Sequence, residues 1–211
     1  MKTFVIADVH GCYDALVDLL EISGVRPGKD RLVLLGDYID RGRQEHEVLA
    51  LLMDLRSRYS NDLFIPLRGN HEQMALDDAE RYGAKESRFG TAELDFMKHL
   101  PVSFEDEQWF YVHGGIHPDK RLSDQTVEEM LWIREECYLY PGLLEKKLVF
   151  GHTPTRLIHG KDEPLIWKDR VALDTGCVFG GKLSCLIIEN GIAVKTCSVP
   201  HGGRKELSHA A

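Results

Sequence analysis

The chain has 211 residues, 43% hydrophobic and 28% charged, a composition typical of a globular protein that can bury one good core. Its formal net charge of −8 argues against a general binder of nucleic acids or anionic membranes, because such proteins carry excess Lys and Arg. The longest wholly apolar run, Val48 to Met53, is far too short to span a membrane.

The cellular compartment is indicated by two further features. The N-terminal apolar stretch ends at Asp8, too early for the hydrophobic region of a secretory signal. The cysteines are five in number and include no CxxC pair, which is typical of scattered reduced thiols. We therefore expect a cytoplasmic protein without membrane or nucleic-acid partners.

Apolar and amphipathic segments alternate along the first two thirds of the chain. The expected strands cover residues 3–7, 31–36, 62–67, 109–115 and 147–153. The expected helices cover residues 14–23, 45–59 and 123–134, the last capped by Ser123 or Asp124. Strands that alternate with helices predict parallel crossover units and an α/β fold.

Two regions depart from this alternation. Gln73 to about Leu100 has a helical and more polar pattern, which predicts a small lobe or lid. After residue 169 the strands follow one another directly, and the segment 183–199 folds back at Asn190-Gly191, a strong hairpin signal. The sheets should therefore be mixed. No linker divides the chain, so we expect one catalytic domain over residues 1–200, followed by a polar tail over residues 201–211.

Five expected strands end in polar residues of one kind. The sequences at these ends are DVHG after residue 7, GDYIDRG after 35, RGNHE after 67, HGG after 112 and GHTP after 150. Ligands of α/β proteins sit at the carboxyl edge of the sheet, so these side chains should converge there. A single His after a strand is usually a hydrogen-bonded structural residue, but five such ends in order are hard to explain as turns.

These motifs, in this order, closely resemble those of the phosphoprotein phosphatase (serine/threonine protein phosphatase) family of metallophosphoesterases. The match is best with its short bacteriophage and bacterial branch, because GNHEQM, LWIREE and LDTGCVFGGKLS are similar as well. The resemblance extends from about Phe4 to Glu189. It implies a four-layer sandwich of two mixed β-sheets flanked by helices, with a small helical lobe.

The resemblance implies two divalent metal ions with a shared ligand. Asp8, His10 and Asp37 would hold one ion, and Asp37 would bridge to a second ion. The ligands of the second ion would be Asn70, His113 and His152. Carboxylate, imidazole and amide ligands suit Mn, Fe or Zn, and we expect Mn. Such a pair would activate a hydroxide that attacks phosphorus directly, without a phosphoenzyme.

The resemblance also assigns catalytic roles outside the metal ligands. His71 would protonate the leaving-group oxygen as general acid, and Asp40 would pair with that imidazole. Arg41 and Arg134 would bind the phosphate oxygens, because a guanidinium group matches phosphate geometry. Near a helix end, Arg134 could equally be a solvated residue. Asp174 and Phe179 would lie at the edge of the site, although ordinary packing explains Phe179 as well.

The expected activity is hydrolysis of phosphoserine or phosphothreonine in a phosphoprotein or phosphopeptide, with phosphotyrosine as a further substrate. An alternative is a diadenosine tetraphosphate or nucleotide phosphohydrolase of the same superfamily. Those relatives tend to carry Ala at the position of Asp40 and Asp at the position of Glu72, which favours the protein phosphatase. A metal-free scaffold is a third alternative, but it should have lost ligands that are all present here. The sequence does not indicate the physiological substrate, the oligomeric state or the role of the lobe.

Overall fold

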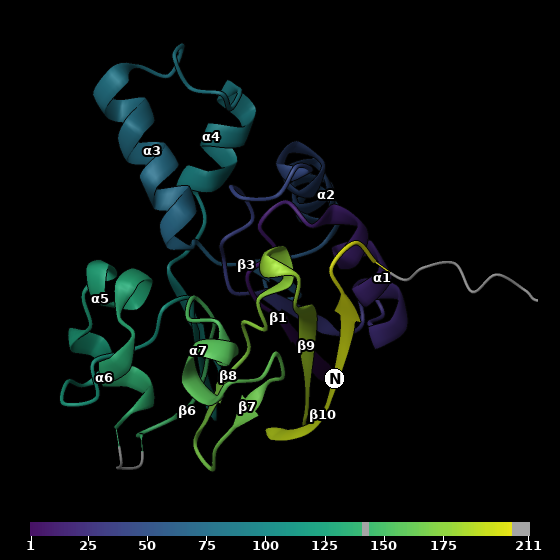
Figure 1. Ribbon diagram of the computed structural model, residues 1–211, viewed down its shortest axis with the longest axis vertical. Coiled ribbons are helices and arrows are strands. Elements are labelled where there is room, and N and C mark those ends of the chain that lie inside the picture. Colours follow the sequence, from purple (N-terminus) through teal and green to yellow (C-terminus); the bar gives the residue numbers. More distant parts are fainter. Residues whose placement is uncertain (141–143, 204–211) are drawn as a thin grey trace, which may run out of the picture.

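The computed structural model describes residues 1–140 and 144–203, and Figure 1 shows its arrangement. The part of the expected tail from residue 204 onward lies outside the described residues. No helix in the described ranges combines the length and the apolar character needed to cross a membrane. The boundary of the expected single domain stays a prediction.

The first sheet combines the N-terminal strands with the C-terminal hairpin, in the order β10-β9-β1-β2-β3. Its strands are β1 (Lys2–Ile6), β2 (Arg31–Leu34), β3 (Phe64–Pro66), β9 (Lys182–Glu189) and β10 (Ile192–Pro200). β1, β2 and β3 are parallel, connected through α1 (Tyr13–Ser23) and α2 (Glu45–Arg58). β9 is antiparallel to both of its neighbours, so the sheet is mixed, as expected.

The second sheet has the order β4-β5-β6-β8-β7. Its strands are β4 (Ser103–Glu105), β5 (Trp109–Val112), β6 (Lys147–Phe150), β7 (Leu165–Ile166) and β8 (Arg170–Ala172). The three central strands are parallel and the two edge strands are antiparallel to them. The short helices of this half are α5 (Val127–Trp132), α6 (Glu135–Tyr138) and α7 (Thr155–His159).

Alternate residues of the same strand enter different hydrophobic cores. Val5 of β1 and Tyr111 of β5 belong to the core between the two sheets. Phe4 belongs to a second core, with Leu16 of α1. Phe110 belongs to a third core on the outer face of the second sheet, which includes residues of α5 and α6. Helices, sheet, sheet and helices therefore form the expected four layers (Figure 1).

The helical lobe consists of α3 (Asn70–Tyr82) and α4 (Thr91–Lys98), which stand out beyond the two sheets at the top of Figure 1. α4 is anchored through Leu94 and Met97, which are buried in the core on the helical side of the first sheet. The predicted small lobe is therefore present, and its first helix begins at the end of β3 rather than at Gln73.

The predicted hairpin and one predicted helix had different outcomes. Asn190 and Gly191 both have positive φ, 50° and 72°, as a two-residue turn of this type requires, so the hairpin is confirmed. The helix expected over residues 123–134 is present but shorter, Val127–Trp132, so only its expected bounds are wrong. It begins after Thr126, whose hydroxyl accepts a hydrogen bond from Glu129 N while Glu129 bonds back to Thr126 N. This reciprocal cap outcompetes Ser123 and Asp124, and the helix ends before Arg134.

Candidate metal centre

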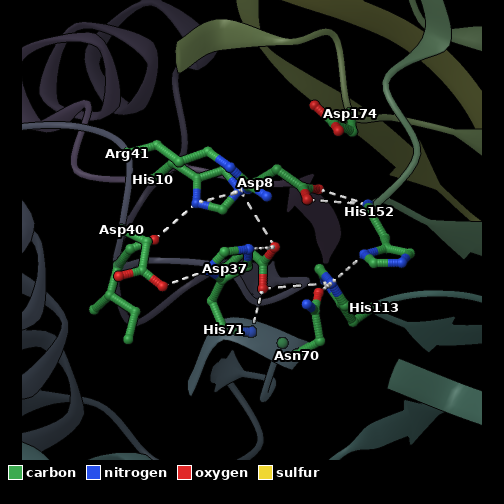
Figure 2. Close-up of polar contacts among 12 residues, drawn as sticks. Asp8, His10, Asp37, Asp40, Arg41, Asn70, His71, His113, His152 and Asp174 are labelled. Atoms are coloured by element: carbon green, nitrogen blue, oxygen red, sulfur yellow. Dashed lines mark hydrogen bonds and ion pairs between the residues drawn. The ribbon is translucent and has the colours of Figure 1, made fainter. Parts of the chain in front are cut away.

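The carboxyl ends of the parallel strands of both sheets bring their polar side chains together in one place (Figure 2). Figure 2 shows the side chains that gather there: Asp8, His10, Asp37, Asp40, Arg41, Asn70, His71, His113, His152 and Asp174. Every residue that the sequence predicted as a metal ligand is in this group. The expected convergence of distant strand ends therefore occurs, while the role of each residue stays a prediction.

The backbone at these strand ends adopts an unusual conformation. Positive φ angles at residues other than Gly concentrate here: Asp8, His10, Asp37, Asp40, Arg41 and His152 have φ between 40° and 68°. A left-handed conformation costs an L-residue roughly 1–2 kcal/mol. Such strain persists only where surrounding structure compensates, and it clusters at functional sites.

Glu72 provides part of that compensation. Its carboxylate is fully buried and accepts hydrogen bonds from the backbone N–H groups of Asp37 (2.9 Å), Tyr38 (2.7 Å) and Gly69 (2.8 Å). A side chain at Gly69 would collide with this loop, because its Cβ would lie 2.3 Å from Asp37 N. Burial and the charge of Asp37 raise the pKa of Glu72 to about 7. The Glu of the GNHE sequence thus holds the loop that carries Asp37.

One potential ligand group consists of His10, Asp37 and His71. His10 Nδ1 donates to the carbonyl of Ile39 (2.7 Å), so the lone pair of Nε2 faces the cavity, 3.3 Å from Asp37 Oδ2. Burial opposes ionisation of Asp37, but the neighbouring His113 and His10 rings outweigh it and hold the pKa of Asp37 well below its usual range.

A second group consists of Asp37, His113 and His152, with Asn70 beside them. His113 Nδ1 donates to the carbonyl of Leu35 (3.0 Å), which leaves Nε2 as a lone-pair atom. This Nε2 lies 2.8 Å from Asn70 Oδ1, 3.2 Å from His152 Nδ1 and 3.4 Å from Asp37 Oδ1. Burial and the neighbouring His113 lower the pKa of His152 to about 2, so its imidazole is neutral.

These residues fit a pair of divalent cations. Lone-pair atoms of two neutral imidazoles, an amide and a carboxylate face each other at close range, which is the donor set that a divalent transition-metal ion binds. His152 takes part through Nδ1, the ring nitrogen that lies 3.2 Å from His113 Nε2. Burial and the charges of Asp174 and Asp37 raise the pKa of Asp8 well above its usual value. Asp37 belongs to both groups, as the predicted bridging ligand should.

Asp8 is arranged differently from the other predicted ligands. Both of its carboxylate oxygens accept a hydrogen bond from His152 N at 3.0 Å. Asp8 thereby connects the first sheet to the loop after β6, in addition to facing the cavity (Figure 2). Nearby Asp174 is buried, and burial raises the pKa of its carboxyl group to about 6.

His71 and Asp40 form a pair next to the ligand groups. His71 Nδ1 contacts Asp40 Oδ2 directly, and its other ring nitrogen, Nε2, lies 3.9 Å from Asp37 Oδ2. One nitrogen therefore faces a carboxylate while the other faces the metal-ligand cavity. The hydrogen bond from His71 lowers the pKa of Asp40, so Asp40 is a stable anionic partner for an imidazole N–H.

The two predicted phosphate-binding arginines line one cavity of about 520 Å³. The Arg41 guanidinium contacts His10 Nε2 and lies 5.5 Å above the ring of Phe179. Arg134 donates to the carbonyl of His152 and to Thr153 Oγ1, both at 3.1 Å. Arg134 is therefore tied to the site and is not merely a solvated residue. Phe179 is 57% exposed in the cavity wall, so ordinary packing does not explain it.

Sequence reasoning missed two contributors. Glu72 stands three residues after Gly69, the capping-box position of α3, and that spacing is a signal that could have identified it. Arg88 contacts Asp40 from the loop between α3 and α4. No local pattern identifies Arg88, because its partner lies 48 residues away in the chain.

Comparison with known proteins agrees with this geometry. The sequence pattern of the family described as calcineurin-like phosphoesterases matches residues 1–185. The fold is similar to that of a protein provisionally assigned as a diadenosine tetraphosphatase, with a TM-score of 0.77, 24% identity, and 94% and 93% of the two chains covered.

Two phosphatases have the same fold. A cold-active protein-tyrosine phosphatase of a psychrophilic Shewanella species has a TM-score of 0.71 and 20% identity, covering 96% of this chain and 78% of its own. A protein serine/threonine phosphatase from Saccharomyces cerevisiae, with similarity to human phosphatase PP5, has a TM-score of 0.66 and 16% identity, covering 99% and 82%. At these identities the similarity shows the fold alone.

Proposed function

The chain belongs to the calcineurin-like phosphoesterase family, and we propose that it hydrolyses phosphoserine or phosphothreonine side chains of proteins in the cytoplasm. Family membership places its activity among metal-dependent hydrolyses of phosphoesters. The finer assignment is supported by the His71–Asp40 pair beside the ligand groups. Phosphoserine leaves as an alkoxide, a poor leaving group that needs a proton donor.

Two divalent ions would be held by the side chains of Asp8, His10, Asp37, Asn70, His113 and His152. We propose Mn²⁺, with Fe or Zn as alternatives, because these ions suit imidazole, carboxylate and amide ligands. When bound, the ions supply positive charge that polarises a phosphoryl oxygen and lowers the pKa of the attacking water. This local charge also explains how a chain with a net charge of −8 attracts a phosphate.

The remaining residues bind the substrate and move one proton. Arg41 and Arg134 line the cavity beside the ligand groups, where their guanidinium groups can bind phosphate oxygens. Asp40 accepts the Nδ1–H of His71, which orients the ring so that Nε2 faces the ligand groups. As the ester bond breaks, Nε2 of the protonated ring donates its proton to the departing serine oxygen.

The test compares two substrates in a His71→Asn variant. Loss of the acid should lower kcat on a phosphoserine peptide by roughly 10²–10⁴-fold. The loss on p-nitrophenyl phosphate should be much smaller, because nitrophenolate leaves without a proton. Manganese content, measured by metal analysis, should stay unchanged. The matched control is His99→Asn, since His99 is an exposed histidine of the lobe. Equal losses on both substrates would refute the general-acid role.

A second candidate, hydrolysis of a dinucleotide such as diadenosine tetraphosphate, is favoured by Phe179. Its exposed ring and Arg156 line the same cavity as Arg41, and a nucleobase could stack on that ring. An exposed aromatic ring also suits a phosphotyrosine side chain. Relative kcat/KM for a phosphoserine peptide, a phosphotyrosine peptide and diadenosine tetraphosphate at equal Mn²⁺ ranks the candidates. Faster turnover of the dinucleotide would replace our proposal with the second candidate.

A metal-free scaffold is the alternative without catalysis. It predicts a purified protein that binds no manganese in equilibrium dialysis and leaves p-nitrophenyl phosphate intact. Our proposal predicts the opposite result in both measurements.

A further inference from the structure

Arg88 connects the helical lobe to two carboxylates of the main body. It lies in the loop between α3 and α4, and its Nη2 contacts Asp40 Oδ1. Its Nε donates to Glu45 Oε1 at 2.9 Å, and Nη2 lies 3.3 Å from Glu45 Oε2. A single guanidinium group therefore spans the loop after β2 and the first residue of α2.

Asp40 makes three polar contacts, one through its backbone and one through each carboxylate oxygen. Its backbone N–H donates to Glu45 Oε2 at 2.9 Å, Oδ1 contacts Arg88 and Oδ2 contacts His71 Nδ1. Within the described residues, Arg88 is the only Arg or Lys in an ion pair with Asp40. Because Arg88 occupies one carboxylate oxygen, the other is directed at the imidazole.

Repulsion between carboxylates also indicates that Arg88 holds the Asp40 side chain in place. Among the described residues, Arg88 is the one Arg or Lys that forms an ion pair with both the Asp40 and the Glu45 carboxylates. Without Arg88 the two carboxylates would repel each other, and the Asp40 side chain would turn away. The left-handed backbone of Asp40, with φ of 67°, would also lose support.

The position of the guanidinium group is itself set by the lobe. It lies 4.5 Å above the ring of Phe89, which is buried in the core beside α2. A second contact between α2 and α4 reinforces the arrangement: His46 Nδ1 lies 2.7 Å from Glu93 Oε1. Glu93 in turn caps Gly90 N at 2.8 Å, next to Phe89. The loop that carries Arg88 is thus packed against the main body on both sides.

We propose that Arg88 is a positioning residue for the general acid: it holds Asp40 so that the His71 ring keeps Nδ1–H on Asp40 and Nε2 toward the leaving group. The inference rests on the proposed function of His71. It assigns a task to the lobe of residues 70–98, because α3 supplies His71 and the following loop supplies the group that orients it.

The kinetic test uses Arg88→Ala, Arg88→Lys and the control Arg81→Ala. Arg81 lies at the end of α3 over the ring of Tyr82, without contact to Asp40. Arg88→Ala should lower kcat on a phosphoserine peptide about tenfold, a part of the 10²–10⁴-fold effect of a general acid. The change on p-nitrophenyl phosphate should be less than about twofold. Arg88→Lys should recover part of the loss, since one ammonium cannot bridge both carboxylates as guanidinium does. Equal losses on both substrates, or an equal loss in Arg81→Ala, would overturn the proposal.

A second measurement is independent of turnover. The nitrogen chemical shifts of the His71 ring, identified by their absence in His71→Asn, report the hydrogen bonding of each ring nitrogen. In Arg88→Ala the Nδ1 signal should move toward that of a ring nitrogen without a carboxylate partner, whereas Arg81→Ala should leave the shifts unchanged. Unchanged His71 shifts in Arg88→Ala would refute the positioning role. If the wild type hydrolyses neither phosphoester, the proposed function fails, but these shifts still decide whether Arg88 orients His71.

Discussion

Aspartate side chains have opposite electrostatic surroundings at the two ends of the parallel strands. At the amino ends, three carboxylates lie beside an arginine: Asp30 with Arg26, Asp106 with Arg31, and Asp169 with Arg170. At the carboxyl ends, the carboxylates gather with imidazoles and with each other (Figure 2): Asp8, Asp37 and Asp174. The first set consists of ion pairs within the chain, and the second set has room for cations from outside.

The pKa directions express this difference. The hydrogen bond from Arg26 lowers the pKa of Asp30 to about 2, whereas burial raises the pKa of Asp174 to about 6. Asp30 immediately precedes β2 and Asp174 follows β8 by two residues. Proximity to a strand therefore says little about the energetic role of a carboxylate, and the charges that surround it decide that role.

The largest effect should come from the shared ligand. Asp37→Asn should lower kcat at least about 10³-fold, because it weakens both ligand groups and each metal contributes several kcal/mol to the transition state. Metal analysis should find fewer than two manganese ions per chain. The matched change at the opposite edge, Asp106→Asn, should keep both the activity and the metal. Full activity in Asp37→Asn would show that Asp37 is not a ligand shared by two metal ions.

Metal binding should stabilise the folded protein through the ligands at the carboxyl ends of the parallel strands and not through the carboxylates at their amino ends. Each site filled by Mn²⁺ at about 100 times its Kd adds about 2.7 kcal/mol to the free energy of unfolding. Urea unfolding with Mn²⁺ and with a chelator measures this difference, and the chelator should also abolish phosphatase activity. Asp37→Asn should lose most of the stabilisation by Mn²⁺, while Asp106→Asn should retain it.

Removing the charge at the amino edge should destabilise the protein. Asp30 is buried and accepts hydrogen bonds from Arg26 Nε at 2.8 Å and Nη2 at 3.0 Å. Asp30→Asn should lower the free energy of unfolding by about 2 kcal/mol at pH 7. Because the folded pKa is lowered, this contribution is present above about pH 4 and is lost as the pH falls toward about 2. If Asp30→Asn still lowered the free energy of unfolding by the same amount at pH 2, the ion pair would be excluded as the cause.

An Asp→Asn substitution at the carboxyl ends of the strands should change the free energy of unfolding in the opposite direction. In the presence of a chelator, Asp174→Asn should raise the free energy of unfolding by about 1 kcal/mol at pH 7, because it removes a buried carboxylate whose ionised form is disfavoured. Gly176 N, which donates to Asp174 Oδ1 at 2.9 Å, can still bond to the Asn carbonyl. Since the folded pKa is raised to about 6, the gain should disappear as the pH falls from about 7 to about 4. Destabilisation at pH 7 would refute this reasoning.

Features that depend on local pattern could be predicted from the sequence. Apolar periodicity identified the central strands and most helices, Asn190-Gly191 identified the hairpin, and the order of the strand-end motifs identified the residues that meet in the cavity. These predictions succeed because a side chain two or three residues past a parallel strand is carried to the same sheet edge in any fold of this class.

Only the tertiary structure decided which charges and hydrogen bonds those residues find. Segments distant in the chain are joined by the hydrogen bond of Glu72 to the Asp37 loop and by the contact of Arg88 with Asp40. The left-handed backbone at the strand ends depends on contacts of this kind. So does the opposite behaviour of the carboxylates at the two edges. Electrostatic energies depend on distance and burial in space, and neither quantity is encoded in the spacing of residues along the chain.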